Sequence, residues 1–483
     1  MSGALSQTPT TLAVETAALD AERFNRYRQY LDFYQGEQWT SRRRAGETRL
    51  TFNYARALVR KTISYLMATP VTFNVLPDAE QDAQALASAI RLAEAALNEV
   101  YAAHDQQLAD VQTAIDAAVL GDGAFKVTWD TARRTPRVAP VDPAGLWAWW
   151  EPDQPGAVYR VAQRYTLTAA EAERLFGVRP AGQPSATARV TVVEEWTAAR
   201  YRVELDGATI LDRPNPYGWV PYVIFPNMAR PHEFWGASDL EDLLDICREL
   251  NARMTTISRV LQVSGYPITV LENVTGSDGV RTEPGAIWEL PEDSRAYLLD
   301  MLGGGVGLHI DYVNLLYRQL HDLSETPRTA FGDSGRSISG VALEVEIQPL
   351  VQKVMRKRRV WDAVYRRRNA LVLDLLERFG GVELRGLRRT QTLWGEVLPS
   401  DRAVLARNET TLVAAQVHSR RQAMAALGDQ DPEQTWAEVL AERDALARPS
   451  PAEKTPSPGE KTPSPPAPLP TLGEGSKDQN GGA

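Results

Sequence analysis

The sequence predicts an α+β protein that is mainly helical, and three observations support this. Apolar residues recur mostly at steps of three, four or seven over residues 339–379, which is typical of one face of a helix. Residues 121–226 alternate between apolar and polar side chains, which is typical of strands. Helical periods occupy most of the chain on both sides of that block. A length of 483 residues allows about two to four domains.

The helix over 339–379 is predicted to begin at Ser339, a residue type favoured at the N-cap. It should end at Gly380 and Gly381, where glycine can adopt the left-handed conformation. Such a helix would be roughly 60 Å long. Pro349 removes one helical hydrogen bond, so we expect a kink near it. The predicted buried face consists of Val341, Val345, Val354, Trp361, Tyr365, Val372, Leu375 and Phe379.

The polar side of the same helix carries a basic stripe. Such a stripe is either a solvated face or a surface that meets phosphates or acidic groups on a neighbouring subunit. We favour a neighbouring subunit, because a long, kinked, charged helix is typical of an assembly subunit rather than a compact enzyme. The subunit-interface candidates are Lys353, Arg356, Lys357, Arg358, Arg359, Arg366, Arg367 and Arg368, together with the acidic residues Asp239, Glu241 and Asp242.

The N-terminal part of the chain is predicted to be mostly helical. Residues 1–19 are expected to form a flexible arm, and the helix that follows should end at Gly36. A basic loop at 41–49 precedes a helix that Pro70 ends, and the short strand VTFNV comes next. Residues 80–120 should form two alanine-rich helices.

The β-rich block begins at the turn Gly121-Asp122-Gly123 and is expected to contain one short helix, at 168–177. The helical period then returns. A second long helix is predicted to start at Ser238, with Glu241 three residues later at the capping-box spacing. Its first turn is acidic, which the helix dipole favours.

The C-terminal half alternates between these types of structure. Residues 266–300 are predicted to form strands and turns, and a shorter helix follows. The loop at 326–338 leads into the long helix, and residues 382–399 are irregular with strand character. Residues 401–447 form a helical unit. The remaining tail, in which EKTPSP occurs twice, has too little apolar surface to fold alone.

Composition excludes several classes of function. The net charge of −9 and the pI near 5.4 argue against a protein that binds nucleic acid over its whole surface. Cys247 cannot form an intrachain disulfide because it is the one cysteine, so a reducing compartment fits. The histidines are scattered, and Arg336 replaces the second glycine expected after a protease-like GDSG. We therefore expect no catalysis, no cofactor, no metal and no membrane span.

Seven stretches, taken together and in order, carry a resemblance to a known family. They lie between about residues 20 and 380 and read FYQGEQW, NYARALVRKTISYLMATPVTF, GDGAFKV, VPYVIFPN, GASDLEDLLDICRELN, LSETPRTAFG and SISGVALEVEIQPLVQKVMRKRRVW. In this order the chain resembles the portal proteins of tailed double-stranded DNA bacteriophages, of the long-tailed phage type. The part after Gly381 matches less well, and the proline-rich tail lies outside the pattern.

The resemblance implies a portal-like subunit of a dodecameric ring around a DNA channel at one capsid vertex. An αα stalk with a small β insertion, which the periodicity also favours, fits this architecture. The implied parts are a flexible arm (1–19), a wing (20–235, helical over 20–120 and β-rich over 121–226), a stem helix (236–265), a small α/β clip (266–307), a second stem helix (308–325), a tunnel loop (326–338), the long kinked wing helix with its connector (339–399), a helical crown (400–447) and a disordered tail (448–483).

The resemblance also implies partners and a location. The partners are double-stranded DNA, the terminase large subunit, capsid and scaffolding proteins and a head–tail adaptor, in a virion assembled in the host cytoplasm. The alternative is a DNA-binding or chromatin-like structural protein that uses the basic helix 353–368. In the tunnel loop, Arg328 and Arg336 could touch passing phosphates while Asp333 opposes tight binding. The loop candidates are Arg328, Asp333, Ser334, Arg336 and Ser337.

Overall fold

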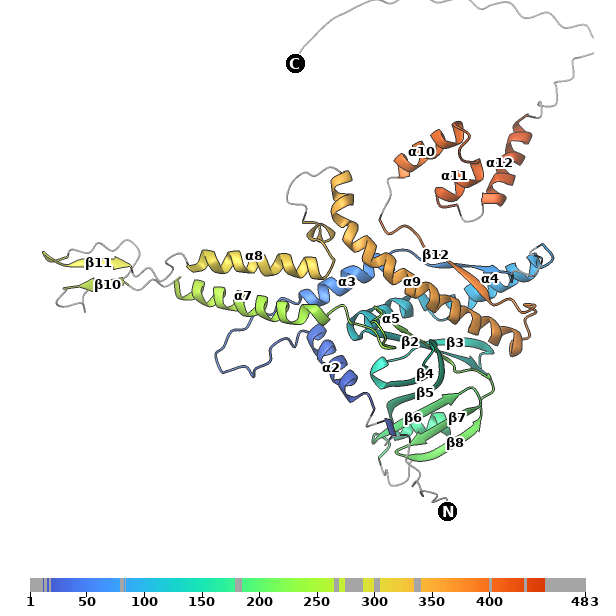
Figure 1. Cartoon of the computed structure of the whole chain (residues 1–483), viewed down its shortest axis with the longest axis horizontal. Coiled ribbons are helices and arrows are strands. Elements are labelled where there is room, and N and C mark those ends of the chain that lie inside the picture. The colour runs from blue at the N-terminus through green and yellow to red at the C-terminus, as the bar shows by residue number, and fades with distance from the viewer. Residues whose placement is uncertain are drawn as a thin grey trace, which may run out of the picture. The chain divides into compact units, whose positions relative to one another are not determined.

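The computed structural model describes two compact units, one before and one after residue 399 (Figure 1). Each unit mixes helices with irregular segments, and the first also holds small antiparallel sheets, so the predicted α+β class with mainly helical content is confirmed. The described residues are 12, 15–16, 19–78, 82, 84–178, 185–264, 269–273, 290–298, 305–333, 340–398, 402–429 and 432–447.

The N-terminal helices form as their sequences predict. They are α2 (Ala21–Gln35), α3 (Tyr54–Leu66), α4 (Ala87–Ala102) and α5 (Gln106–Leu120). Helix α2 ends at Gly36, whose φ of 108° places it in the left-handed region that favours glycine. Strand β1 (Thr72–Leu76) follows α3 and pairs with β12 (Arg389–Leu393), from the segment expected to be irregular with strand character.

The expected flexible arm is wrong for the residues of it that the structure describes. Leu12 and Thr16 are buried. Glu15 forms an ion pair with Arg160 of the β-rich block, with 2.9 Å between the charged atoms. The described residues of the arm therefore pack on the β-rich block, because Leu12 is apolar and Glu15 is a carboxylate that pairs with Arg160.

The β-rich block contains two antiparallel sheets. The smaller has the order β3-β2-β9 and the larger is a meander, β4-β5-β6-β7-β8. The short helix α6 (Ala169–Phe176) starts with a capping box between Thr168 and Glu171. The strands are β2 (Asp122–Asp130), β3 (Thr135–Pro140), β4 (Leu146–Glu151), β5 (Gln154–Thr168), β6 (Arg189–Thr197), β7 (Arg200–Leu205), β8 (Ala208–Pro214) and β9 (Tyr222–Pro226).

Helix α9 (Gly340–Arg378) lies against α3, β2, β9 and β12 and closes the core of the first unit (Figure 1). Most of its predicted apolar face is buried, including Trp361 and Tyr365. Val345 is an exception at 66% exposure. Pro349 lies inside the helix, and Figure 1 shows that α9 bends in its first part, as predicted. The predicted N-cap Ser339 lies outside the described residues.

Helices α7 (Leu244–Ser264) and α8 (Gly305–Leu323) form an antiparallel pair (Figure 1). The short strands β10 (Thr269–Glu272) and β11 (Arg295–Leu298) pair within the connection between them. The predicted helix start at Ser238 is wrong. A 3-10 turn, η2 (Glu241–Leu243), precedes α7, and the Ser238 oxygen accepts from the Leu240 amide two residues on rather than from the Glu241 amide.

The second unit contains three helices in its described part: α10 (Arg402–Ala414), α11 (Arg420–Ala426) and α12 (Pro432–Ala447). A capping box between Ser419 and Gln422 starts α11. The proline-rich tail from 448 onward lies outside the described residues. Among the helices of the described parts, none combines the length and apolar character needed to cross a membrane.

Candidate functional site: the junction of α7, α8 and α9

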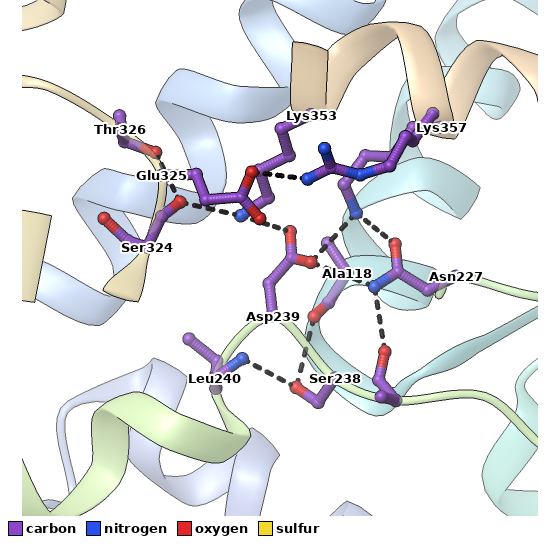
Figure 2. Close-up of polar contacts among 12 residues, drawn as sticks. Ala118, Asn227, Ser238, Asp239, Leu240, Ser324, Glu325, Thr326, Lys353 and Lys357 are labelled. Carbon is purple, nitrogen blue, oxygen red and sulfur yellow. Dashed lines mark hydrogen bonds and ion pairs between the residues drawn. The ribbon is translucent and has the colours of Figure 1, made fainter. Parts of the chain in front are cut away.

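Helix α9 places two lysines, one turn apart, against a single carboxylate. The Nζ of Lys357 lies 2.9 Å from Oδ1 of Asp239, and the Nζ of Lys353 lies 3.6 Å from Oδ2 (Figure 2). The lysines share one face because side chains four residues apart are neighbours on a helix. All three side chains are buried, at 7%, 2% and 4% exposure for Lys353, Lys357 and Asp239. We call this group, with its hydrogen-bonded neighbours, the junction.

The junction is joined to the β-rich block through Asn227, which follows β9. Its Oδ1 accepts a hydrogen bond from Lys357, and its Nδ2 donates to Asp239 over 3.1 Å. The hydroxyl of Ser238 donates to the carbonyls of Ala118 and Val119 in α5, over 3.2 and 2.5 Å, and accepts from the Leu240 amide. Figure 2 shows the contacts with Ala118 and Leu240. These bonds fix the segment that leads into α7.

The junction also holds the end of α8. Lys353 donates to the carbonyl oxygen of Ser324 over 3.1 Å, and Arg356 forms an ion pair with Glu325 (Figure 2). Glu325 has a φ of 52°, a left-handed conformation that is uncommon for a residue with a side chain. Helix α9 therefore contacts the residues just before α7 and just after α8, and these contacts fix the base of the helix pair.

The charges in the junction stabilise one another. Burial alone would raise the pKa of Asp239, but Lys353 and Lys357 lower it to about 2. Burial lowers the pKa of Lys357, and Asp239 opposes that effect. The carboxylate is therefore ionised between two ammonium groups. No group of three or more potential metal-ligating side chains occurs among the described residues. The arrangement can hold elements together, and it contains no nucleophile with an adjacent base.

A second buried ion pair lies further along α9. Arg368 donates to both carboxylate oxygens of Asp110 in α5, over 2.5 and 3.1 Å. The rings of Tyr101, Phe125 and Tyr365 surround its guanidinium, with centroids 4.8 to 4.9 Å away. Bidentate geometry and stacking on aromatic rings both suit arginine rather than lysine. This pair joins α9 to α5.

The structure corrects the predicted subunit interface. Lys353, Lys357, Arg368 and Asp239 are paired within the subunit, and the buried Arg358 donates to the carbonyl of Gly395. These five residues are therefore not available to a neighbour. The reason is that other elements of the same chain cover this part of the stripe. The same burial removes Lys353, Lys357, Arg358 and Arg368 from the basic face that a DNA-binding protein of this kind would use.

The remaining interface candidates are more accessible. Arg356 and Glu241 have intrachain partners, Glu325 and Arg230. Arg367 is half-buried and donates to the carbonyl of Gly156, and the exposed Arg366 donates within its own helix. Arg359 and Asp242 are exposed.

The first half of the predicted tunnel loop is structured. Arg328 starts a 3-10 turn, η4 (Arg328–Phe331), and its guanidinium lies 5.1 Å from the ring of Tyr317 in α8. Arg328 also forms an ion pair with Asp333, and both side chains are about half exposed. The structure therefore brings two of the five loop candidates together. Ser334, Arg336 and Ser337 lie outside the described residues.

Sequence reasoning missed the partners of the buried charges. Asn227, Ser324 and Asp110 lie far along the chain from α9, and no local pattern marks them. It also missed Asp122 of the predicted turn, which accepts hydrogen bonds from Tyr27 and from the Gly236 amide. Burial raises the pKa of Asp122 to about 6. The sequence Gly121-Asp122-Gly123 directly after a helix could have indicated this contact, because the small glycines on each side of Asp122 allow another backbone to approach closely.

Comparison with known protein families gives one match. The model of the family "Phage portal protein, SPP1 Gp6-like" matches residues 17–448, which is most of the chain. A comparison with curated proteins gave no match. The family match includes α9, the α7–α8 pair and the junction that fixes them, and it agrees with the resemblance carried by the seven sequence stretches. The chain therefore belongs to the phage portal protein family, of the SPP1 Gp6-like type.

Proposed function

We propose that this portal protein is one subunit of a closed ring, a dodecamer, that surrounds a channel for double-stranded DNA at one vertex of the capsid. The terminase large subunit would drive the genome inward through the channel, and the genome would later leave by the same route. Capsid and scaffolding proteins and a head–tail adaptor would attach to the ring, which assembles in the host cytoplasm. The role is structural and needs no catalysis.

One observation carries the ring: α8 has an apolar face that the described part of the subunit leaves uncovered. Leu308 is 75% exposed, and Tyr312, Leu315 and Leu323 are exposed on the same side of the helix. Contiguous apolar surface of this kind marks an interaction site. Heterologous contacts between identical subunits form a ring when the rotation between them closes. A neighbouring copy is therefore the cover we propose.

We propose the following roles for the parts, by their order in the chain. Helices α7 and α8 serve as the stem, and the segment with β10 and β11 serves as the clip. The loop 326–338 lines the channel, residues 400–447 form the crown and residues 20–235 the wing. Exposed Arg359, Arg366 and Asp242 remain candidates for contacts between subunits, and Arg356, Arg367 and Glu241 could contribute their exposed atoms. The pair of Arg328 with Asp333 supports a channel surface that is nearly neutral and binds passing phosphates weakly.

Negative-stain microscopy and mass photometry of the purified chain test this proposal. We expect rings with a central hole and a mass that is a multiple of the 53.5 kDa subunit. Leu308→Glu combined with Leu315→Glu should abolish the rings, whereas Leu92→Glu, an exposed leucine on α4, should leave them intact. A monomer at every ionic strength and protein concentration would contradict the proposal.

A further inference from the structure

The basic loop between α2 and α3 is fixed against α7. The Asn251 side chain accepts a hydrogen bond from the Phe52 amide over 2.8 Å and donates to Gln38 over 2.6 Å. One helical turn later, the hydroxyl of Thr255 accepts from the Leu50 amide over 3.1 Å. Both ends of the loop are therefore held by one face of α7.

The loop also has internal support. Arg49 donates to the Ser41 carbonyl over 2.6 Å and to the Arg42 carbonyl over 3.1 Å, and its guanidinium lies 5.1 Å from the ring of Trp39. Glu47 pairs with Arg49 at 3.0 Å. This scaffold presents three consecutive exposed arginines, Arg42, Arg43 and Arg44. Hydrogen bonds from the Arg49 side chain and the Arg44 amide lower the pKa of the Glu47 carboxyl group, and the nearby charge of Arg44 contributes to the same shift.

The loop and α8 lie on opposite sides of α7. The guanidinium of Arg253 in α7 lies 5.9 Å from the ring of Tyr312 in α8. Successive helical residues are rotated by about 100°, so Arg253 points about 160 to 200° away from Thr255 and Asn251, which hold the loop. Figure 1 shows the same order, with α7 between α8 and the blue loop that follows α2. The subunit therefore has a basic flank and a flank formed by α8.

The α8 flank has an exposed carboxylate at the height of Thr255, the α7 residue that holds the loop end at Leu50. Asp311 is exposed and lies beside the uncovered apolar residues Leu308, Tyr312 and Leu315. A helix advances about 1.5 Å per residue and the two helices are antiparallel. We take the contact of Arg253 with Tyr312 as the reference point. Thr255 lies two residues after Arg253, and Asp311 lies one residue before Tyr312 in the antiparallel helix. Thr255 and Asp311 are therefore within about 2 Å of the same height along the pair.

We propose that the loop arginines Arg42, Arg43 and Arg44 of one copy dock on the α8 face of the next copy, with Asp311 as their anionic partner. This inference rests on the proposed ring. Copies in a ring are related by rotation alone, so surfaces that meet between stem helices standing along the axis must lie at equal height. Asp311 and Thr255, which holds the loop end at Leu50, satisfy that condition. The two flanks carry opposite charge, and the apolar side chains beside Asp311 supply area to bury.

A charge-swap experiment with the full chain tests the pairing. Variant A carries Arg42→Glu, Arg43→Glu and Arg44→Glu, and variant B carries Asp311→Arg. When A is alone, the loop glutamates of one copy face Asp311 of the next. When B is alone, the loop arginines face the arginine at position 311. Because like charges meet in both cases, each variant should need a more than about tenfold higher protein concentration than wild type to assemble. In an equimolar mixture every A–B contact joins opposite charges, so mass photometry should show assembly at wild-type concentrations. Arg133→Glu with Arg134→Glu and Arg137→Glu, three exposed arginines at the β2–β3 hairpin, is the charge-matched control for variant A and should assemble normally.

The outcomes separate this inference from the ring itself. Rings of wild type that persist in A and in B would leave the proposed function standing and overturn the pairing. Failure of the mixture to assemble, with A and B folded by circular dichroism, would also overturn it. If A assembled normally but lost affinity for a 30-base-pair duplex DNA, the loop would serve nucleic acid and the inference would be wrong. A wild type that never assembles would instead contradict the proposed function.

Discussion

Lys357 of α9 donates a hydrogen bond over 2.9 Å to Asp239, a residue 118 positions earlier in the chain. Asp239 precedes the first helix of the α7–α8 pair, so this contact ties the longest helix to the base of that pair. A buried ion pair adds little net stability compared with a well-packed apolar contact, but removing one partner is costly. Here the ion pair fixes the positions of α7, α8 and α9 relative to one another.

Acid should weaken the junction in a defined pH window. The folded-state pKa of Asp239 is about 2, since Lys353 and Lys357 outweigh the effect of burial, whereas an unfolded aspartate has a pKa of about 3.9. The pair's contribution is therefore complete above about pH 4 and is lost as the pH falls toward about 2, by up to about 2 kcal/mol. Guanidinium titrations from pH 5 to pH 2.5 should show a steeper loss in wild type than in Asp239→Asn. Equal slopes would contradict the assignment.

Removal of one buried ammonium group should destabilise the subunit. Lys357→Met removes the ammonium group that donates to both Asp239 and Asn227, so the buried carboxylate keeps only Lys353 as a cationic partner, and the free energy of unfolding should fall by about 3 kcal/mol. Arg359→Met, two residues further along the same helix but exposed, should change it by less than about 0.5 kcal/mol. Chemical denaturation followed by tryptophan fluorescence measures both. Similar shifts in the two variants would show that burial of the pair does not matter.

The pair between Arg368 and Asp110 should discriminate between basic side chains. Lysine keeps the charge but loses the second hydrogen bond and the aromatic stacking, so Arg368→Lys should cost about 3 kcal/mol. The matched control is Arg366→Lys, an exposed position on the same helix, which should be close to neutral. The thermal midpoint is the readout, and a tolerated Arg368→Lys would mean that charge alone holds α5 to α9.

The loop after α8 should affect DNA passage if it lines the channel. Arg328→Glu breaks the pair with Asp333 and adds a negative charge that repels phosphate, so less DNA should be packaged per capsid. Arg328→Lys should retain packaging, and Arg133→Glu, in the exposed turn between β2 and β3, serves as the charge control. Packaged length is measured by gel electrophoresis of nuclease-protected DNA. Full packaging by Arg328→Glu capsids with intact rings would remove this loop from the mechanism.

Periodicity predicted the helices well because each helix carries its own pattern. The face that includes Trp361 and Tyr365 is buried as predicted, and Gly36 ends α2 where expected. Val345 fails the prediction, since a pattern identifies which side is apolar without identifying what covers it. The same is true of α8, whose apolar face is left uncovered by the described part of the subunit.

Charge patterns were less informative because their meaning depends on distant partners. The stripe on α9 has the spacing of a solvated face, yet Lys353 and Lys357 are buried on Asp239, and Arg368 is buried on Asp110. Those carboxylates are separated from α9 by more than 100 residues, so a local reading cannot find them. The Ser238 N-cap prediction also failed: the Ser238 oxygen accepts from the Leu240 amide and its hydroxyl donates to the distant Val119 carbonyl, which fixes Ser238 outside the helix.

The position of α9 late in the chain has a consequence for how the protein is made. A ribosome completes α3, β2 and β9 long before residues 340–378 exist, and β1 must wait for β12, whose Leu393 pairs with Thr72. Until then the apolar surfaces of these elements are open to water and to other nascent chains. Contacts so distant in sequence form slowly. Truncated products that stop before α9 should therefore aggregate. The yield of folded subunits should depend on chaperones that bind the incomplete first unit.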